Sequence, residues 1–295
     1  MGSKEFWTKM MHIDRKIIYI LIALSVIIPL LFPFGTKSHV TPPTKRIYDE
    51  VEKMALHEQG RKGVLMLSFD YDPSTLPELQ PMTWAMIRHA FSRNVKVVGL
   101  TLFPEGAGLV KAAFDSLSRE YNKREGIDFV NLGYKPGISA VIMSMGESIE
   151  KTFLQDYNNT PIREIPMMKN IKNYNDVDLI VTFSGTGTVV SWITYAHGRY
   201  HINIATGVTA VMASDYYPYL QTGQFIGMLG GLKGAAEYEK LLLESKNAMA
   251  NPKLVDFKPT AQIGMDAQNI SHLVILVFII IGNLAYFLSG QARRK

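Results

Sequence analysis

Two long uncharged apolar runs, one near each end, are the sequence feature that most constrains this chain. Residues 17–34 read IIYILIALSVIIPLLFPF, and residues 273–288 read LVILVFIIIGNLAYFL, with Asn283 as the one strongly polar residue. The hydrocarbon core of a bilayer is about 30 Å thick and takes roughly 20 apolar residues in a helix. With their uncharged neighbours, both runs reach that length. The sequence therefore predicts transmembrane helices at residues 17–35 and 271–290.

Each run has an alternative interpretation. The first could be a cleaved signal peptide, but signal cores are usually about 7–15 residues long and end in a small-x-small cleavage site. This run is longer and ends in Phe-Pro-Phe-Gly, which favours an uncleaved anchor. The second could be a buried core helix, but it lies next to the basic sequence Arg293-Arg294-Lys295, which favours a membrane span.

The basic residues that flank the two runs predict the orientation. Cations precede the first run and follow the second, and such basic flanks tend to stay in the cytoplasm. Residues 1–16 and 291–295 are thus predicted to be cytoplasmic tails of a double-pass cell-membrane protein, with the central domain outside. Three cations on the far side of the first run oppose this orientation: Lys37, Lys45 and Arg46.

The region between the two runs has the pattern of a single α/β domain. A linker at 36–46 contains a Pro-Pro pair, the domain occupies 47–249, and a connector covers 250–270. Strands are expected at 63–69, 95–103, 128–132, 178–183 and 202–207. Helices are expected at 48–57, 82–94, 108–124, 141–152 and 188–197, and residues 217–247 look mainly helical, broken by glycines. Strands that are apolar throughout and alternate with helices are typical of parallel sheets. We therefore expect a Rossmann-like three-layer sandwich with about five parallel strands.

Composition excludes some functions. The chain has no cysteine, which removes disulfides, thiolate nucleophiles and cysteine metal sites. The net charge of +5 comes mostly from the membrane flanks, and no basic stripe indicates nucleic-acid binding. The histidine spacing gives no metal site, and no cofactor is indicated.

Two carboxylates follow the first expected strand. Asp70 and Asp72 are spaced as in the Asp-x-Asp motif of haloacid dehalogenase-like phosphatases, and Thr101 at the end of the next strand resembles that family's second motif. The resemblance implies a metal-dependent phosphohydrolase. The acidic pair that this family needs after the fourth strand is missing. In the alternative interpretation, Asp70 and Asp72 cap a turn.

A hydroxyl- and glycine-rich turn follows the fourth expected strand and leads into a helix. Its residues are Ser184, Gly185, Thr186, Gly187 and Thr188. Small residues at such a turn allow backbone N–H groups to bind an anion at the helix N-terminus. The alternative is a tight turn with Thr188 as the N-cap and no ligand.

Four glycines and one asparagine are candidate contact residues. Gly227, Gly230, Gly231 and Gly234 would lie on one side of a helix, where they would allow close approach of a partner. Asn283 lies within the second apolar run, where a polar side chain usually faces a partner.

The overall layout, with phrases such as Leu229-Gly-Gly-Leu-Lys-Gly-Ala-Ala-Glu-Tyr-Glu, resembles a family of prokaryotic membrane proteins that has no assigned activity. The resemblance implies an α/β domain between two transmembrane helices and no catalytic residue. The leading hypothesis is a non-enzymatic subunit, anchored in the bilayer, that forms a homo-oligomer or joins a larger membrane protein. A binding module for a small anion comes second, and a phosphohydrolase third.

Overall fold

The computed structural model describes residues 6–7, 9–10, 13–35, 39–56, 63–247 and 249–289. The chain divides into two compact units. One is Ser38–Ala261, and the other combines Met1–Lys37 with Gln262–Lys295.

The larger unit is built on a six-stranded, wholly parallel sheet. Its strand order is β3-β2-β1-β4-β5-β6, so the order reverses between β1 and β4. The strands are β1 (Val64–Asp70), β2 (Lys96–Thr101), β3 (Phe129–Tyr134), β4 (Leu179–Ser184), β5 (Ile204–Val208) and β6 (Gly227–Gly230). The prediction of a Rossmann-like α/β sandwich is confirmed, with one strand more than expected.

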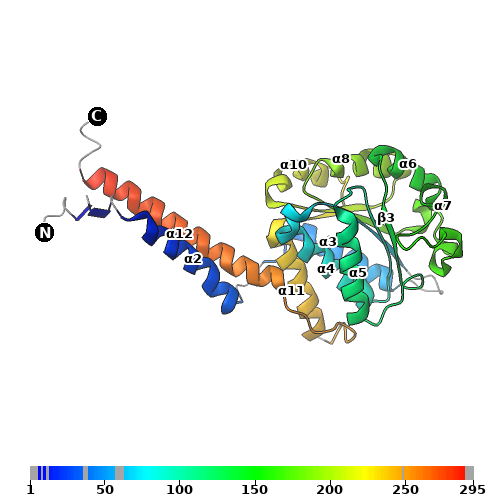
Figure 1. The fold of residues 1–295 in the computed structure, drawn as a ribbon, viewed down its shortest axis with the longest axis horizontal. Helices are drawn as coiled ribbons and strands as arrows, with labels where there is room; N and C mark the ends of the chain where they lie inside the picture. Colours follow the sequence, from blue (N-terminus) through cyan, green and yellow to red (C-terminus); the bar gives the residue numbers. More distant parts are fainter. Residues whose placement is uncertain are drawn as a thin grey trace. The chain divides into compact units, whose positions relative to one another are not determined.

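Helices cover both faces of this sheet (Figure 1). On one face lie α4 (Leu76–Ser92), α5 (Gly106–Glu120) and α11 (Gly231–Asn247), while α3 (Pro42–Ala55) packs against α11 and β6. On the other face lie α6 (Ile138–Glu147), α8 (Thr188–Trp192) and α10 (Ala210–Gln221). Shorter elements complete the unit: η1 (Pro73–Thr75), α7 (Ile149–Thr152), η2 (Ile162–Glu164), η3 (Pro166–Asn170), η4 (Tyr174–Asp176), the π-helical turn η5 (Ile193–His197) and α9 (Gly198–Tyr200).

The core explains why the strands are apolar on both faces. Successive residues of a strand point to opposite sides of the sheet. Met66 of β1 belongs to a cluster with Ile142, Met145 and Trp192, while its neighbours Leu65 and Leu67 are equally buried. Because both sides are covered by helices, a polar side chain in a central strand needs an internal hydrogen-bond partner.

Strand β6 corrects the interpretation of residues 217–247. These residues were expected to be mainly helical, but β6 separates α10 from α11. Gly227 and Gly230 therefore lie in a strand and Gly231 and Gly234 in the following helix, so the single helical glycine face is wrong. A four-residue strand with glycine at both ends carries no β-branched or aromatic residue that would signal a strand.

Helix α3 begins earlier than the sequence indicated. Residues 36–46 were expected to be a linker, yet the helix starts at Pro42, with the Pro-Pro pair in its first turn. Proline suits that position, because the first N–H groups of a helix have no partner within it and the φ of proline already matches the helix.

In the smaller unit, the described residues include helix α2 (Arg15–Leu31) and all of helix α12 (Thr260–Leu288) except its first two residues, which belong to the larger unit. Helix α12 is long and apolar enough to cross a membrane. Its first residues occupy part of the expected connector at 250–270. Helix α2 has 17 residues, or about 25 Å of helix, which is less than the hydrocarbon core requires. The second apolar run thus forms a helix that is long enough to span a membrane, as predicted. The first run does not. Residues 290–295, including the expected cytoplasmic tail at 291–295, lie outside the described residues, as does much of the tail at 1–16.

Hydrogen bonds within this unit fix how the two helices pair. Ser25 Oγ lies 3.3 Å from Ser271 Oγ, and Asp266 accepts the backbone N–H groups of Phe34 and Gly35. Residue 25 lies beside residue 271, and residues 34 and 35 lie beside residue 266. The two chain segments therefore run antiparallel. In this register the centres of the two apolar runs do not lie opposite each other. The centre of 17–34 lies beside a point of α12 that is about eight residues, or roughly 12 Å, before the centre of 273–288.

Candidate functional site

The carboxyl ends of β1 and β4 are the place where ligands bind in sheets of this kind, because the strand order reverses there and leaves a crevice. Asp70 and Ser184 are the last residues of these strands and are register partners. Both are fully buried. The structure therefore brings the two candidate segments, 70–75 and 184–188, to the same point of the sheet edge.

Asp70 is held by donors from the protein itself. Trp192 Nε1 donates to Oδ2 at 2.9 Å, and Thr182 Oγ1 donates to the same oxygen at 3.1 Å. The backbone N–H of Leu102 donates to Oδ1 at 2.8 Å, and Ser68 Oγ lies 2.8 Å from both oxygens. Burial raises the pKa of the Asp70 carboxyl, and these four donors oppose that shift. The side chain thus joins β1 to β2, β4 and α8.

Asp72 has a separate role. Its side chain caps η1 by accepting the backbone N–H of Ser74 at 2.7 Å, and hydrogen bonds from Ser74 lower the pKa of its carboxyl. The alternative that both carboxylates cap a turn therefore holds for Asp72. It is wrong for Asp70, whose side chain is bonded inside the sheet. The two do not share an exposed site of the kind that a phosphatase needs.

Thr101 is also used internally. It is fully buried, and its hydroxyl lies 2.7 Å from the carbonyl oxygen of Phe69 and 2.9 Å from that of Phe103, while it accepts the N–H of Phe103. Thr101 therefore fixes the turn after β2, and its hydroxyl does not face solvent.

The turn at 184–188 is bonded to itself. Ser184 Oγ accepts the N–H of Thr186 at 3.0 Å, and Thr186 Oγ1 lies 3.0 Å from Thr188 Oγ1. Tyr216 donates its hydroxyl to the carbonyl of Thr186. Helix α8 starts at Thr188 with Gly187 as its N-cap, so the expectation that Thr188 is the N-cap is wrong by one residue. Gly187 is exposed, Gly185 and Thr186 are partly exposed, and Ser184 and Thr188 are buried.

A carboxylate is also bonded just after the end of β5, where α10 begins. Glu78, at the start of α4, accepts the first backbone N–H of α10, that of Ala210, at 2.7 Å. The N-terminus of a helix attracts an anion. Sequence reasoning missed Glu78, because nothing in the local pattern tells which distant helix a glutamate will cap.

The four candidate glycines are packed inside this chain. A Cβ at Gly227 would collide with Ile47 and the carbonyl of Pro43 in α3, and one at Gly234 would meet the backbone of Leu229 at 2.8 Å. Gly231 has a φ of +59°, which L-residues rarely adopt, and lies against Ala210. These glycines allow α3, α10 and α11 to approach the sheet edge.

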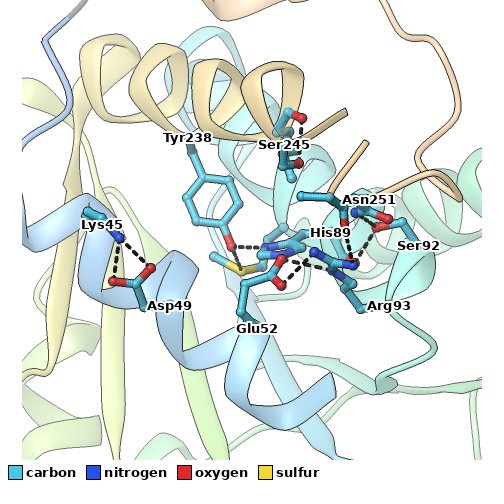
Figure 2. A network of polar contacts seen from close by, with 12 residues as sticks. Lys45, Asp49, Glu52, His89, Ser92, Arg93, Tyr238, Ser245 and Asn251 are labelled. Carbon is cyan, nitrogen blue, oxygen red and sulfur yellow. Dashed lines mark hydrogen bonds and ion pairs between the residues drawn. The ribbon is translucent and has the colours of Figure 1, made fainter. Parts of the chain in front are cut away.

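A second buried polar cluster lies among α3, α4 and α11 (Figure 2). His89 is fully buried, with Nε2 2.7 Å from Glu52 Oε1 and Nδ1 2.8 Å from the hydroxyl of Tyr238. Arg93 pairs with Glu52 at 2.6 Å and donates to the carbonyl of Ala250. Partial burial acts to raise the pKa of Glu52, but the hydrogen bonds from His89 and Arg93 outweigh it and bring this pKa to about 2. Burial lowers the pKa of His89, and Glu52 opposes that shift.

This cluster has the order carboxylate–imidazole–hydroxyl that is used in nucleophilic catalysis. Tyr238 is fully buried, however, and its hydroxyl lies 3.3 Å from Met86 Sδ. A substrate would have to reach an oxygen that is enclosed by the helices. The cluster therefore joins three helices and fixes the segment around Ala250.

Two glutamates of α11 hold the chain where it enters and leaves the domain. Glu237 Oε2 accepts the N–H of Thr41 at 2.9 Å and the hydroxyls of Thr41 and Thr44 at 2.6 and 2.8 Å. Glu239 Oε1 accepts the N–H of Ala261 at 3.2 Å. Both glutamates are 1% exposed. They cap α3 and α12 from a third helix, a pairing that no sequence signal revealed.

Comparison with family models, with curated proteins and with solved structures finds no match for this chain. The resemblance to prokaryotic membrane proteins thus stays a prediction. Among the described residues, no group of three or more His, Asp and Glu side chains could hold a metal ion.

Proposed function

We propose that this chain is a membrane-anchored, non-enzymatic subunit that assembles with itself or with a larger membrane protein. The observation that carries this proposal is that the polar side chains at the switch point of the sheet are buried and hydrogen-bonded to one another. Asp70 and Trp192 are both fully buried and bonded to each other at the point where the strand order reverses.

The internal hydrogen bonds at the carboxyl ends of the strands argue against the two alternatives, a phosphohydrolase and an anion-binding module. A phosphohydrolase would need Asp70 as an exposed nucleophile or metal ligand, and its two oxygens already accept four donors. An anion module would need free helix N-termini. Glu78 already accepts the first N–H of α10, and Thr186 Oγ1 accepts the first N–H of α8, that of Thr188, at 3.4 Å.

The membrane part of the proposal rests on α12. We take α2 as a second span beside it, with the basic ends in the cytoplasm and the α/β domain outside. The register between the helices would then have to shift by about eight residues, unless the pair tilts strongly enough to fit both apolar runs into the bilayer.

The particle mass of the full chain in mild detergent tests this function. We expect either a multiple of 33.1 kDa or a stable complex with a co-purifying membrane protein. Inorganic phosphate and Mg²⁺ should give no heat on titration at millimolar concentration. A lone monomer in several detergents and in nanodiscs would overturn the assembly function, and saturable phosphate binding that Thr186→Val removes would favour the anion module.

A further inference from the structure

The two sides of α12 differ in what covers them. Ala267 and Ala285 are buried, and Ser271, which lies on the same side, bonds to Ser25 of α2. Side chains four, seven or eighteen residues apart lie on one face of a helix, since each residue turns it by about 100°. This covered side of α12 therefore faces the other helix of its own unit.

Asn283 lies on the opposite side, roughly 160° from Ala285 at 100° per residue. Its side chain is exposed, and Nδ2 donates to the carbonyl of Ile279 in the same helix at 2.8 Å. The amide oxygen and the second N–H have no partner among the described residues. An amide within about one turn of the centre of an apolar span is costly when it faces lipid.

The neighbours of Asn283 form a stripe with a defined spacing. His272, Leu276, Ile279 and Asn283 are separated by four, three and four residues, which is the spacing of positions that face a partner helix in a coiled coil. All four side chains are exposed. The stripe therefore has the repeat of a helix–helix contact but no helix of the described chain against it.

We infer that this stripe of α12 binds the α12 helix of a second copy of the chain, with the two Asn283 amides hydrogen-bonded to each other. The partner is a second copy because an amide is both donor and acceptor, so two identical amides facing across a two-fold axis complement each other. A single polar residue in such a stripe also fixes the register of the two helices. This inference rests on the proposed assembly function and names its partner and its surface.

Single cysteines test the contact directly, because the chain has none of its own. Ile279→Cys lies on the stripe and leaves Asn283 in place, whereas Val277→Cys is an exposed control on another side of α12. Oxidation in native membranes should cross-link Ile279→Cys to twice the chain mass and leave Val277→Cys monomeric. Equal cross-linking of both variants, or of neither, would overturn the inference.

Substitutions of Asn283 provide the second measurement. Asn283→Leu should weaken self-association by roughly threefold to tenfold in a detergent dilution series, and Asn283→Gln should retain it because the amide is kept. The exposed Leu284→Ala is the matched control and should have no effect. An oligomer that Asn283→Leu leaves intact, or a complex with a different protein that persists without cross-links, would overturn this contact while the proposed function stands. A monomer under all conditions would overturn both.

Discussion

The indole N–H of Trp192 donates to Oδ2 of Asp70 at 2.9 Å, and both side chains are fully buried. This bond joins the end of β1 to the helix that follows β4, which are the two segments that border the ligand crevice in sheets with this strand order. Asp70, the acidic residue that most resembles a catalytic carboxylate in the sequence, is therefore bonded inside the domain.

Replacing Trp192 tests how much this bond contributes. Trp192→Phe removes the donor and part of the buried volume, so the free energy of unfolding should fall by about 2–4 kcal/mol. Trp84→Phe is the control, since Trp84 is partly exposed and contacts Arg88 through its ring, and it should cost under about 1 kcal/mol. Urea unfolding followed by circular dichroism measures both. Equal losses would mean that the bond to Asp70 adds nothing.

The Glu52–His89 pair should make stability depend on pH. The folded-state pKa of Glu52 is about 2, below its unfolded value near 4.3, so its contribution is present above about pH 4.3 and is lost as the pH falls toward 2. The folded-state pKa of His89 is also lowered, so the unfolded chain takes up a proton first as the pH falls through about 6.5. Both groups therefore make the protein less stable in acid.

The variant His89→Gln measures the contribution of His89, which changes stability at higher pH than Glu52 does. Between pH 7.5 and 5.5, the melting temperature of the natural sequence should drop more than that of His89→Gln. His39→Gln, at an exposed position, should behave like the natural sequence. Parallel curves for all three proteins would contradict the role of His89.

Substitution of Gly227 tests whether this glycine is needed for packing within the domain or for contact with another molecule. Gly227→Ala should lower the melting temperature, because the added methyl collides with Ile47 and the carbonyl of Pro43. Gly108→Ala in α5 meets open space and should stabilise the protein by up to about 1 kcal/mol. The particle mass in detergent should stay the same for both. A Gly227→Ala protein that melts normally but dissociates would restore a contact surface at these glycines.

Glu237 should contribute to stability through the start of α3. Glu237→Ala leaves the N–H of Thr41 and two threonine hydroxyls without their acceptor, which should cost about 1–3 kcal/mol. Glu244→Ala, an exposed residue paired with Lys240, is the control and should change stability by less than about 0.5 kcal/mol. Thermal unfolding in detergent compares the two. Similar effects would show that the cap is weak.

Single cysteines also determine the topology. Ala112→Cys, at an exposed position in α5, should react with a membrane-impermeant maleimide in intact cells, and Lys9→Cys should react only after lysis. Labelling of both in intact cells would mean that α2 does not cross the membrane. Protection of Ala112→Cys would invert the orientation.

The fold class and α12 as a membrane-capable helix were determined by the sequence alone, because both depend on local patterns. Wholly apolar strands such as Val64–Asp70, alternating with helices, are enough to predict a buried parallel sheet. With its uncharged neighbours, the run at 273–288 reaches the length of apolar helix that a bilayer core needs. Each of these signals is carried by neighbouring residues.

The tertiary structure decided what the polar residues do. Asp70 resembled a catalytic carboxylate until Trp192, more than a hundred residues away, was found bonded to it, and Glu78 and Glu237 gave no signal before the helices they cap lay beside them. Strand β6 exists because β5 and α3 lie on either side of a glycine-rich segment with little strand preference of its own. Hydrogen-bond partners and close backbone contacts join residues that are distant in the chain, so local sequence patterns do not reveal them.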